Sequence, residues 1–412
     1  MKRVMVPYFR PDIRKREVDE AGAVLKSGWL TTGPRVKSFE EKFAAAVEGR
    51  HAVAVNSATA ALHLAVEALG LKAGQAVLVP TMTFAATAEV VRYLGAIPVL
   101  VDCDPVTGNL DLEDASRKLE DLRARRLPAR IPHDSKAVGI IPVHVGGLML
   151  DMDVVSSWAK ARRLWVVEDA AHAFPAAFRK SSRSQWRRCG QKTSAVSCFS
   201  FYANKTITTG EGGMAITEDR ALADRMRLMS LHGLSHDAWG RYSGGGSWDY
   251  RIMAPGFKYN LTDIAAAIGI HQLARAEKMR RARERVARRY LAGLEHVEEL
   301  ELPPDPSDRI HAWHLFPIRL RLERLRIDRN RFMEELKKAG VGCSVHWRPL
   351  HLHPYYMKTF GWRKADLPVA TALWPRLVSL PIFPAMREVE ISTVVRTVVE
   401  LCRRHRRRPG RV

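Results

Sequence analysis

Short apolar runs alternate with helical stretches along the first half of the chain, and this alternation limits the possible folds more than any other feature. The runs are Ala52–Val55, Ala76–Val79, Ile97–Val101, Val138–Val143, Leu164–Val167, Val196–Phe201 and Met214–Thr217. Helices are expected between them, at about Thr59–Leu69, Phe84–Leu94 and Asp153–Arg163. Strands that are apolar on both faces and separated by helices are typical of a mostly parallel sheet covered by helices. The sequence therefore predicts the α/β class.

A second, smaller domain is expected after this sheet. The residues from Asp263 to about Glu295 have the pattern of one long helix that links the two domains. Strands are then predicted near His314–Arg321 and Gly342–His346, with a helix at Arg329–Ala339 that ends at Gly340. We therefore divide the chain into a large domain (1–265), a small α+β domain (266–400) and a basic, disordered tail (401–412).

The chain is strongly basic. Lys and Arg total 66 against 44 Asp and Glu in 412 residues, so the formal net charge is +22. The excess gathers in the loop Arg179–Lys192, in the segment Ala274–Arg289 and in the last ten residues. Most of it is expected to be solvated surface, although such a field also helps phosphate-bearing substrates to arrive. Specific nucleic-acid binding is not expected, because no helix-turn-helix or zinc-finger pattern accompanies the charge.

Sequence signals for secretion, membrane insertion and metal binding are absent. The N-terminal residues MKRVMVPYFRPDIRKRE lack the apolar core of a signal peptide, and the apolar run Val138–Leu150 is too short to span a bilayer. The five cysteines form no C-x-x-C pair. His346, His351 and His353 share one short stretch, but no metal site is predicted there. We expect a cytoplasmic protein that does not enter the membrane.

Asp169 and Lys205 are the candidate catalytic residues. Asp169 ends a buried strand in VVEDAAH, and Lys205 follows an apolar strand in FSFYANKTITTGEGG. In parallel sheets ligands bind beyond the carboxyl ends of the strands, which is where both residues lie. A lysine amine forms a Schiff base with the aldehyde of pyridoxal phosphate (PLP), and a carboxylate keeps its pyridine nitrogen protonated. This pair therefore predicts a PLP site.

Neighbouring motifs offer the other contacts that PLP needs. Ser57, in NSATAA between a strand and a helix, is a suitable N-cap that brings backbone N–H groups toward a phosphate, and Ser200 is a second phosphate donor. His172 is placed to reach the ring, and Phe84 to stack on it. Each has a plainer interpretation: an ordinary capped helix, a core histidine and a core phenylalanine.

These motifs together resemble the DegT/DnrJ/EryC1/StrS family of sugar aminotransferases. The likeness rests on VEDAAH, FSFYANK and GEGG, and it extends from about Val6 to Pro384 through SGWLTTGP, SATAALHLA, GFKYNLTD and HAWHLFPIRL. The resemblance implies a PLP-dependent transferase of fold type I. It also implies a homodimer whose two active sites lie at the subunit interface.

The resemblance also implies further roles for individual residues. Ala58 and Thr59 match the family's phosphate contacts beside Ser57 and Ser200. Lys258 and Asn260, in GFKYN, match a segment that reaches into the partner's site. The substrate contacts implied by the resemblance are Trp29 and Thr31 in SGWLTTGP, and His346 in SVHWRPLH.

The activity implied is transfer of an amino group from L-glutamate to a nucleotide-linked 4-keto-sugar. UDP and dTDP sugars of surface polysaccharide, lipopolysaccharide or secondary-metabolite synthesis are the expected substrates. SGWLTTGP, HGL, GFKYNLTD and HAWHLF are also similar to the aminotransferase that forms UDP-4-amino-4-deoxy-L-arabinose. One family branch replaces the lysine with histidine and dehydrates sugars, so Lys205 favours transamination. Amination of a cyclitol ketone, sugar dehydration, and a regulator that binds nucleic acid through its Arg-rich tail stay open as alternatives.

Overall fold

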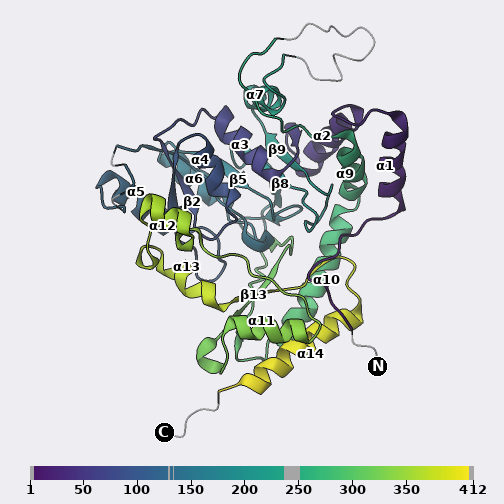
Figure 1. Cartoon of the computed structure of the whole chain (residues 1–412), viewed down its shortest axis with the longest axis vertical. Coiled ribbons are helices and arrows are strands. Elements are labelled where there is room, and N and C mark those ends of the chain that lie inside the picture. The colour runs from purple at the N-terminus through teal and green to yellow at the C-terminus, as the bar shows by residue number, and fades with distance from the viewer. Residues whose placement is uncertain (1–3, 129, 133, 236–250, 408–412) are drawn as a thin grey trace.

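A seven-stranded sheet lies at the centre of the structure. The computed structural model describes residues 4–128, 130–132, 134–235 and 251–407. In Figure 1 the sheet lies in the middle of the upper half of the molecule. Its strands, in spatial order, are β1 (His51–Val55), β9 (Gly213–Thr217), β8 (Val196–Ser200), β5 (Trp165–Asp169), β4 (Ala137–Ile140), β2 (Ala76–Pro80) and β3 (Ile97–Val101). Strand β9 is antiparallel to β1 and β8, and the other neighbours are parallel. The predicted α/β class with a mostly parallel sheet is confirmed.

Helices connect the strands and cover the sheet. They are α3 (Ala58–Ala68), α4 (Ala86–Tyr93), α5 (Leu112–Arg123), α6 (Met152–Ala161) and α7 (Arg220–Ser230). Four of these five begin at a Ser or Asp whose side chain accepts hydrogen bonds from the first turn: Ser57, Asp111, Asp151 and Asp219. The local sequence thus sets where these helices start. Among the described residues, no helix combines the length and apolar character needed to cross a bilayer.

The single long helix predicted for 263–295 is wrong. The structure has two helices there, α9 (Asp263–Leu273) and α10 (Ala276–Leu294). Between them Arg275 leaves the helical conformation, with φ −113° and ψ 4°, and its guanidinium binds Asp12 and Glu17 at 2.8 and 2.5 Å. Those acids belong to the N-terminal segment and α1 (Lys15–Ser27), which packs on α9 beside α2 (Pro34–Val47) (Figure 1). A long-range ion-pair cluster therefore breaks a helix that the local pattern continues.

A second apolar core lies below the first. It is built on an antiparallel sheet of β10 (Leu300–Glu301), β12 (Phe316–Leu320) and β13 (Leu377–Leu380), with α10, α11 (Arg329–Lys338) and α14 (Glu388–His405) packed against it. Figure 1 shows α10 running from α9 down to this group. Val6 belongs to this core, whereas Phe360 in α12 (Pro354–Phe360), just before α13 (Pro368–Leu373), packs into the first. The domain boundary at residue 265 stays a prediction.

The tail predicted to be disordered from residue 401 is ordered as far as Arg407. Helix α14 continues to His405, with Leu401 and Cys402 buried in the second core. Glu335 binds Arg404 and His405 at 3.6 and 3.0 Å, and Arg406 pairs with Glu299. The Arg-rich composition suggested disorder, but acids on neighbouring segments fix these side chains. Residues 408–412 lie outside the described residues.

The basic loop Arg179–Lys192 packs onto the chain. It contains β7 (Arg187–Arg188), which pairs with β6 (Ala177–Phe178), and β6 pairs in turn with β11 (Arg309–Ile310). Three of its cations face acids of other segments: Arg187 pairs with Asp153, Arg188 with Glu48 and Lys192 with Glu218. Three of the loop's six cations are therefore paired with acids of the same chain.

Candidate active site

One cavity of about 570 Å³ gathers most of the predicted site residues. It lies beyond the carboxyl ends of β5 and β8 and at the start of α3, as expected for a parallel sheet. The predicted residues that line it are Ser57, Ala58, Thr59, Phe84, Asp169, His172, Ser200, Lys205 and His346. Residues far apart in the sequence thus meet at one place.

Asp169 is buried and firmly held at the end of β5. Its Oδ2 accepts a 2.7 Å hydrogen bond from the Thr87 hydroxyl, and its Oδ1 accepts one of 3.2 Å from the Ala171 N–H. Burial raises the pKa of Asp169 above its ordinary value, although these hydrogen bonds and nearby Lys205 act the other way. An opposite charge placed beside it would therefore keep this carboxylate ionised.

Lys205 sits on a turn that side-chain hydroxyls hold in place. The Thr208 hydroxyl donates to the Phe201 carbonyl at 3.0 Å, and the Thr209 hydroxyl to the Glu211 carbonyl at 2.7 Å. Gly210 has φ +82°, which explains the glycine in this turn. Burial lowers the pKa of Lys205 from 10.5 to about 7; Asp169 opposes this fall and Arg283 adds to it. A large part of the amine is therefore neutral, and nucleophilic, near pH 7.

The N-terminus of α3 offers an anion-binding corner. The Ser57 side chain caps the helix by accepting from the Ala60 N–H at 3.1 Å. Ala58 and Thr59, in the first turn, line the cavity with Ser200 from the end of β8. Gly213 lies so close to this corner that a side chain there would overlap the Ser57 carbonyl group. The GEGG motif thus lets β9 approach the start of α3, whose free N–H groups suit a phosphate.

Aromatic side chains form another wall. The His172 ring lies 4.1 Å from that of His314 and 5.0 Å from that of Trp347, centroid to centroid. Burial, and then Lys205, lower the pKa of His172 well below its ordinary value and that of His346 to about 4. Phe84 also lines the cavity but is 63% exposed, so it lies toward the mouth. These rings give an uncharged aromatic wall against which a flat ligand can pack.

His346 reaches the cavity from outside any strand, so the strand predicted for 342–346 is wrong. Only one bridge forms there, between Ser344 and Ser379 of β13. The chain then turns so that Val345, His346 and Trp347 line the cavity. His346 Nδ1 and the Ser379 hydroxyl lie 2.8 Å apart, a hydrogen bond that orients the imidazole.

Four predicted site residues do not line the cavity of their own chain: Trp29, Thr31, Lys258 and Asn260. They lie together instead. The Trp29 indole N–H donates to the Thr32 carbonyl at 3.1 Å, and the Asn260 amide to the Thr32 hydroxyl at 2.8 Å. The Lys258 amine also bonds to the Asn260 side chain. The predicted residues thus separate into a cavity group and this second group, which we call the 29–32/258–260 cluster.

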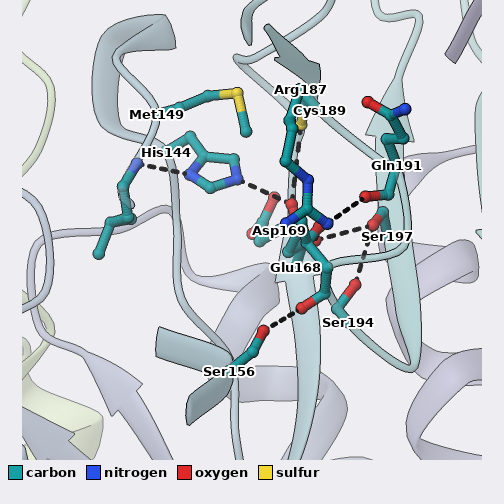
Figure 2. A network of polar contacts seen from close by, with 12 residues as sticks. His144, Met149, Ser156, Glu168, Asp169, Arg187, Cys189, Gln191, Ser194 and Ser197 are labelled. Carbon is teal, nitrogen blue, oxygen red and sulfur yellow. Dashed lines mark hydrogen bonds and ion pairs between the residues drawn. The ribbon is translucent and has the colours of Figure 1, made fainter. Parts of the chain in front are cut away.

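A buried polar network supports the strand behind Asp169 (Figure 2). Glu168 accepts hydrogen bonds from His144 at 3.1 Å and from Ser197 at 3.1 Å, and also from Thr193. Burial alone would raise the pKa of Glu168, but the hydrogen bonds from His144 and Thr193 outweigh it and hold the pKa below its ordinary value. Successive strand residues face opposite sides, so this network anchors β5 while Asp169 faces the cavity.

The same network contains the one group of side chains, within the described residues, whose spacing could hold a metal ion: His144, Glu168 and Cys189. His144 Nδ1 accepts from the Leu150 N–H at 3.3 Å, so Nε2 carries the proton that it shares with Glu168. A protonated ring nitrogen cannot bind a metal. The arrangement is that of a hydrogen-bonded network.

Sequence reasoning missed several residues of the cavity. The sequence assigns no role to His314, Trp347 and Asn204, although HAWHLF, SVHWRPLH and FSFYANK contain them, and all three line the cavity. Thr87 does not line the cavity, but its hydroxyl donates to Asp169. The buried atoms His172 Nδ1, His314 Nδ1 and Asn204 Oδ1 have no hydrogen-bond partner in the described structure. Unpaired polar atoms, a lysine, a carboxylate and a helix N-terminus around one apolar-walled cavity fit the ring, aldehyde and phosphate of PLP.

The fold and the cavity define a class of proteins, the PLP-dependent transferases of fold type I. The chain belongs to the DegT/DnrJ/EryC1/StrS aminotransferase family, whose sequence pattern it matches over residues 11–399. The resemblance read from VEDAAH, FSFYANK and GEGG is thereby confirmed at the level of the family. The protein is a sugar aminotransferase, and its cofactor is PLP.

Relatives share nearly the full length of the chain. It is 42% identical over 404 residues to the uncharacterized protein MJ1066 of Methanocaldococcus jannaschii, covering 97% of this chain and 98% of that one. It is 41% identical over 397 residues to the spore coat polysaccharide biosynthesis protein SpsC of Bacillus subtilis. That match covers 96% of this chain and 97% of SpsC. The fold is similar to a solved structure of the putative sugar aminotransferase Spr1654 from Streptococcus pneumoniae, in its PMP form, with a TM-score of 0.85 and 28% sequence identity. The match covers 97% of this chain and 98% of that one.

Proposed function

We propose that this protein transfers the amino group of L-glutamate to the 4-keto carbon of a UDP- or dTDP-linked sugar. The observation that carries the proposal is that Lys205 and Asp169 line one cavity at the carboxyl ends of neighbouring strands. The relation to SpsC supports a role in polysaccharide synthesis. The net charge of +22 favours a substrate that carries a diphosphate.

The cavity residues divide the work of holding PLP. We assign the ring nitrogen to Asp169, which Thr87 orients, and the phosphate to the N–H groups of Ala58 and Thr59 with Ser200. His172 and Phe84, which line the same cavity, would flank the ring. When bound, PLP supplies an aldehyde that takes up an amino group and a ring that draws off negative charge. Asp169 supports the second property by keeping the ring nitrogen protonated.

Lys205 is the proposed acid and base. Its Nζ would take the proton from the α-carbon of glutamate. The amino group would stay with the cofactor, and water would supply the keto oxygen with which 2-oxoglutarate leaves. In the second half-reaction the lysine returns a proton to the carbon that bears the new amino group of the sugar. A pKa near 7 suits both steps, because the amine is then divided between its neutral and charged forms at neutral pH.

The 29–32/258–260 cluster is proposed to complete the cavity of a second copy of the chain. Its four predicted residues lie outside the cavity of their own subunit, although the sequence nominates them as cofactor and substrate contacts. A two-fold dimer resolves this, because each subunit then supplies the cluster to its partner. Trp29 and Thr31 would face the sugar, as would His346 from within the cavity.

Mixing two inactive variants tests the shared site. Lys205→Ala and Asn260→Ala each damage a different part of it, so a mixed dimer keeps one intact site of two. Refolding a 1:1 mixture is expected to restore about a quarter of the native activity, because half of the dimers are mixed. Activity that never exceeds that of the separate variants, in mixtures shown by mass to contain mixed dimers, would contradict a shared site.

Isotope transfer tests the reaction itself. The purified protein with PLP and ¹⁵N-glutamate is incubated with UDP- and dTDP-4-keto-sugars, starting with the UDP-4-keto-pentose that the sequence resemblance favours. The expected product is an amino-sugar nucleotide that carries the heavy nitrogen. A product that has lost water without gaining nitrogen would show a dehydratase, and labelling only of a free cyclitol ketone would show that a nucleotide is not required.

A further inference from the structure

A buried arginine joins several segments around the cavity. Arg283, on α10, is 2% exposed. Its guanidinium donates to the carbonyls of Ile382 at 2.8 Å, Trp313 at 3.3 Å, His314 at 3.4 Å and Asn204 at 3.3 Å. Asn204 directly precedes Lys205, and the His314 side chain lines the cavity. One side chain therefore ties the peptide before the lysine to the segment that carries His314.

The charge of Arg283 is not balanced in the way that buried cations usually are. Within the described part of the chain it forms no ion pair with a carboxylate, and its Nε has no hydrogen-bond partner. Arg280, one turn earlier and 7% exposed, is paired with both Glu277 and Glu284. Burying an unpaired charge is costly. Burial lowers the pKa of Arg283 only to about 10, so it is still a cation at neutral pH.

We propose that Arg283 is a positioning residue for Lys205: it fixes the peptide that carries the lysine and keeps a buried positive charge beside its amine. The inference deepens the proposed function, on which it rests. Its two parts are separable, because the carbonyl contacts depend on the forked guanidinium and the electrostatic effect depends only on the charge.

The other groups that face Lys205 do not supply this charge. Asp169 favours the protonated amine. The pKa values of His172 and His314 are lowered well below the ordinary value by burial, and that of His346 to about 4, so the three imidazoles are neutral at pH 7. Arg283 is thus the cation that, with burial, works against Asp169 and favours a neutral amine.

The pKa of the Lys205 amine, measured directly, tests the charge. PLP-free protein is labelled briefly with acetic anhydride at a series of pH values, and mass spectrometry of the Lys205 peptide gives the midpoint. Arg283→Gln keeps amide donors but removes the charge, and should raise the midpoint by about one pH unit from about 7, so that labelling at pH 7 falls about fivefold. Arg283→Lys should keep the wild-type midpoint. Arg280→Gln, the matched control, should also leave it unchanged.

PLP affinity tests the positioning. Arg283→Lys should weaken PLP binding several-fold, because one ammonium group cannot reach all four carbonyls. Equal midpoints for wild type, Arg283→Gln and Arg283→Lys would overturn the charge effect, and a Lys variant with wild-type PLP affinity would overturn the positioning. If Arg283→Gln does not fold, the Lys variant decides: a raised midpoint or unchanged affinity refutes the proposal. Neither readout needs a sugar substrate, so a wrong substrate assignment does not affect them.

Discussion

Replacing Lys205 with alanine is expected to lower transamination by about a thousandfold or more, because the variant loses both the nucleophile and the proton carrier. The protein should still fold, since the turn is held by Thr208, Thr209 and Gly210, none of which bonds to the lysine amine. Single-turnover assays with glutamate, in which formation of 2-oxoglutarate is followed, give the rate of the first half-reaction. The visible absorbance of covalently held PLP should also disappear.

Lys180 offers a matched control for this experiment. It lies in the basic loop, is exposed, and does not line the cavity. Lys180→Ala should therefore keep full activity and the visible absorbance. Lys205→Ala with near-native turnover would show that another amine performs the chemistry.

Replacing Asp169 with asparagine is expected to lower turnover by about a hundredfold or more, because a neutral amide cannot keep the ring nitrogen protonated. The change is nearly isosteric, so the Thr87 and Ala171 contacts can persist and the loss reports on charge. Thr87→Val provides a graded comparison. It removes one hydrogen bond to the carboxylate, worth about 1.5–3 kcal/mol at most, and should cost about tenfold.

Acidification should distinguish these variants. Burial raises the pKa of Asp169, so its carboxylate is protonated at a higher pH than an exposed aspartate would be. The stabilisation of bound PLP by this charge is present above that pKa and is lost as the pH falls through it. PLP retention, measured by dialysis at a series of pH values, should therefore fall on acidification in the wild type. Asp169→Asn should lack this transition, and a wild-type profile in the variant would contradict the assigned role.

The sequence predicts the sheet well because each apolar run is complete within a few residues. Ala76–Val79 and Ile97–Val101 need no distant partner to be recognised, and both are strands in the structure. The Lys205 and Asp169 motifs are likewise local. The sequence alone therefore places both residues at the carboxyl ends of strands and predicts the cavity group.

The sequence-based predictions of secondary structure are wrong where contacts with distant segments determine the local structure. The break between α9 and α10 depends on Asp12 and Glu17, more than 250 residues away from Arg275. The ordered end of α14 depends on Glu335 and Glu299. The contacts that Thr87, Trp347 and Arg283 make at the site cannot be predicted from the spacing of residues in the sequence. Pairwise contacts of this kind require the folded chain.

The most direct test of the account is to identify the residue that holds the cofactor. The protein loaded with PLP is treated with borohydride, which fixes PLP to the amine that binds it, and is then digested and analysed by mass spectrometry. We expect one modified peptide, containing Lys205, and none when excess glutamate is added before the borohydride. Modification of a different lysine, with the Lys205 peptide unlabelled, would contradict it.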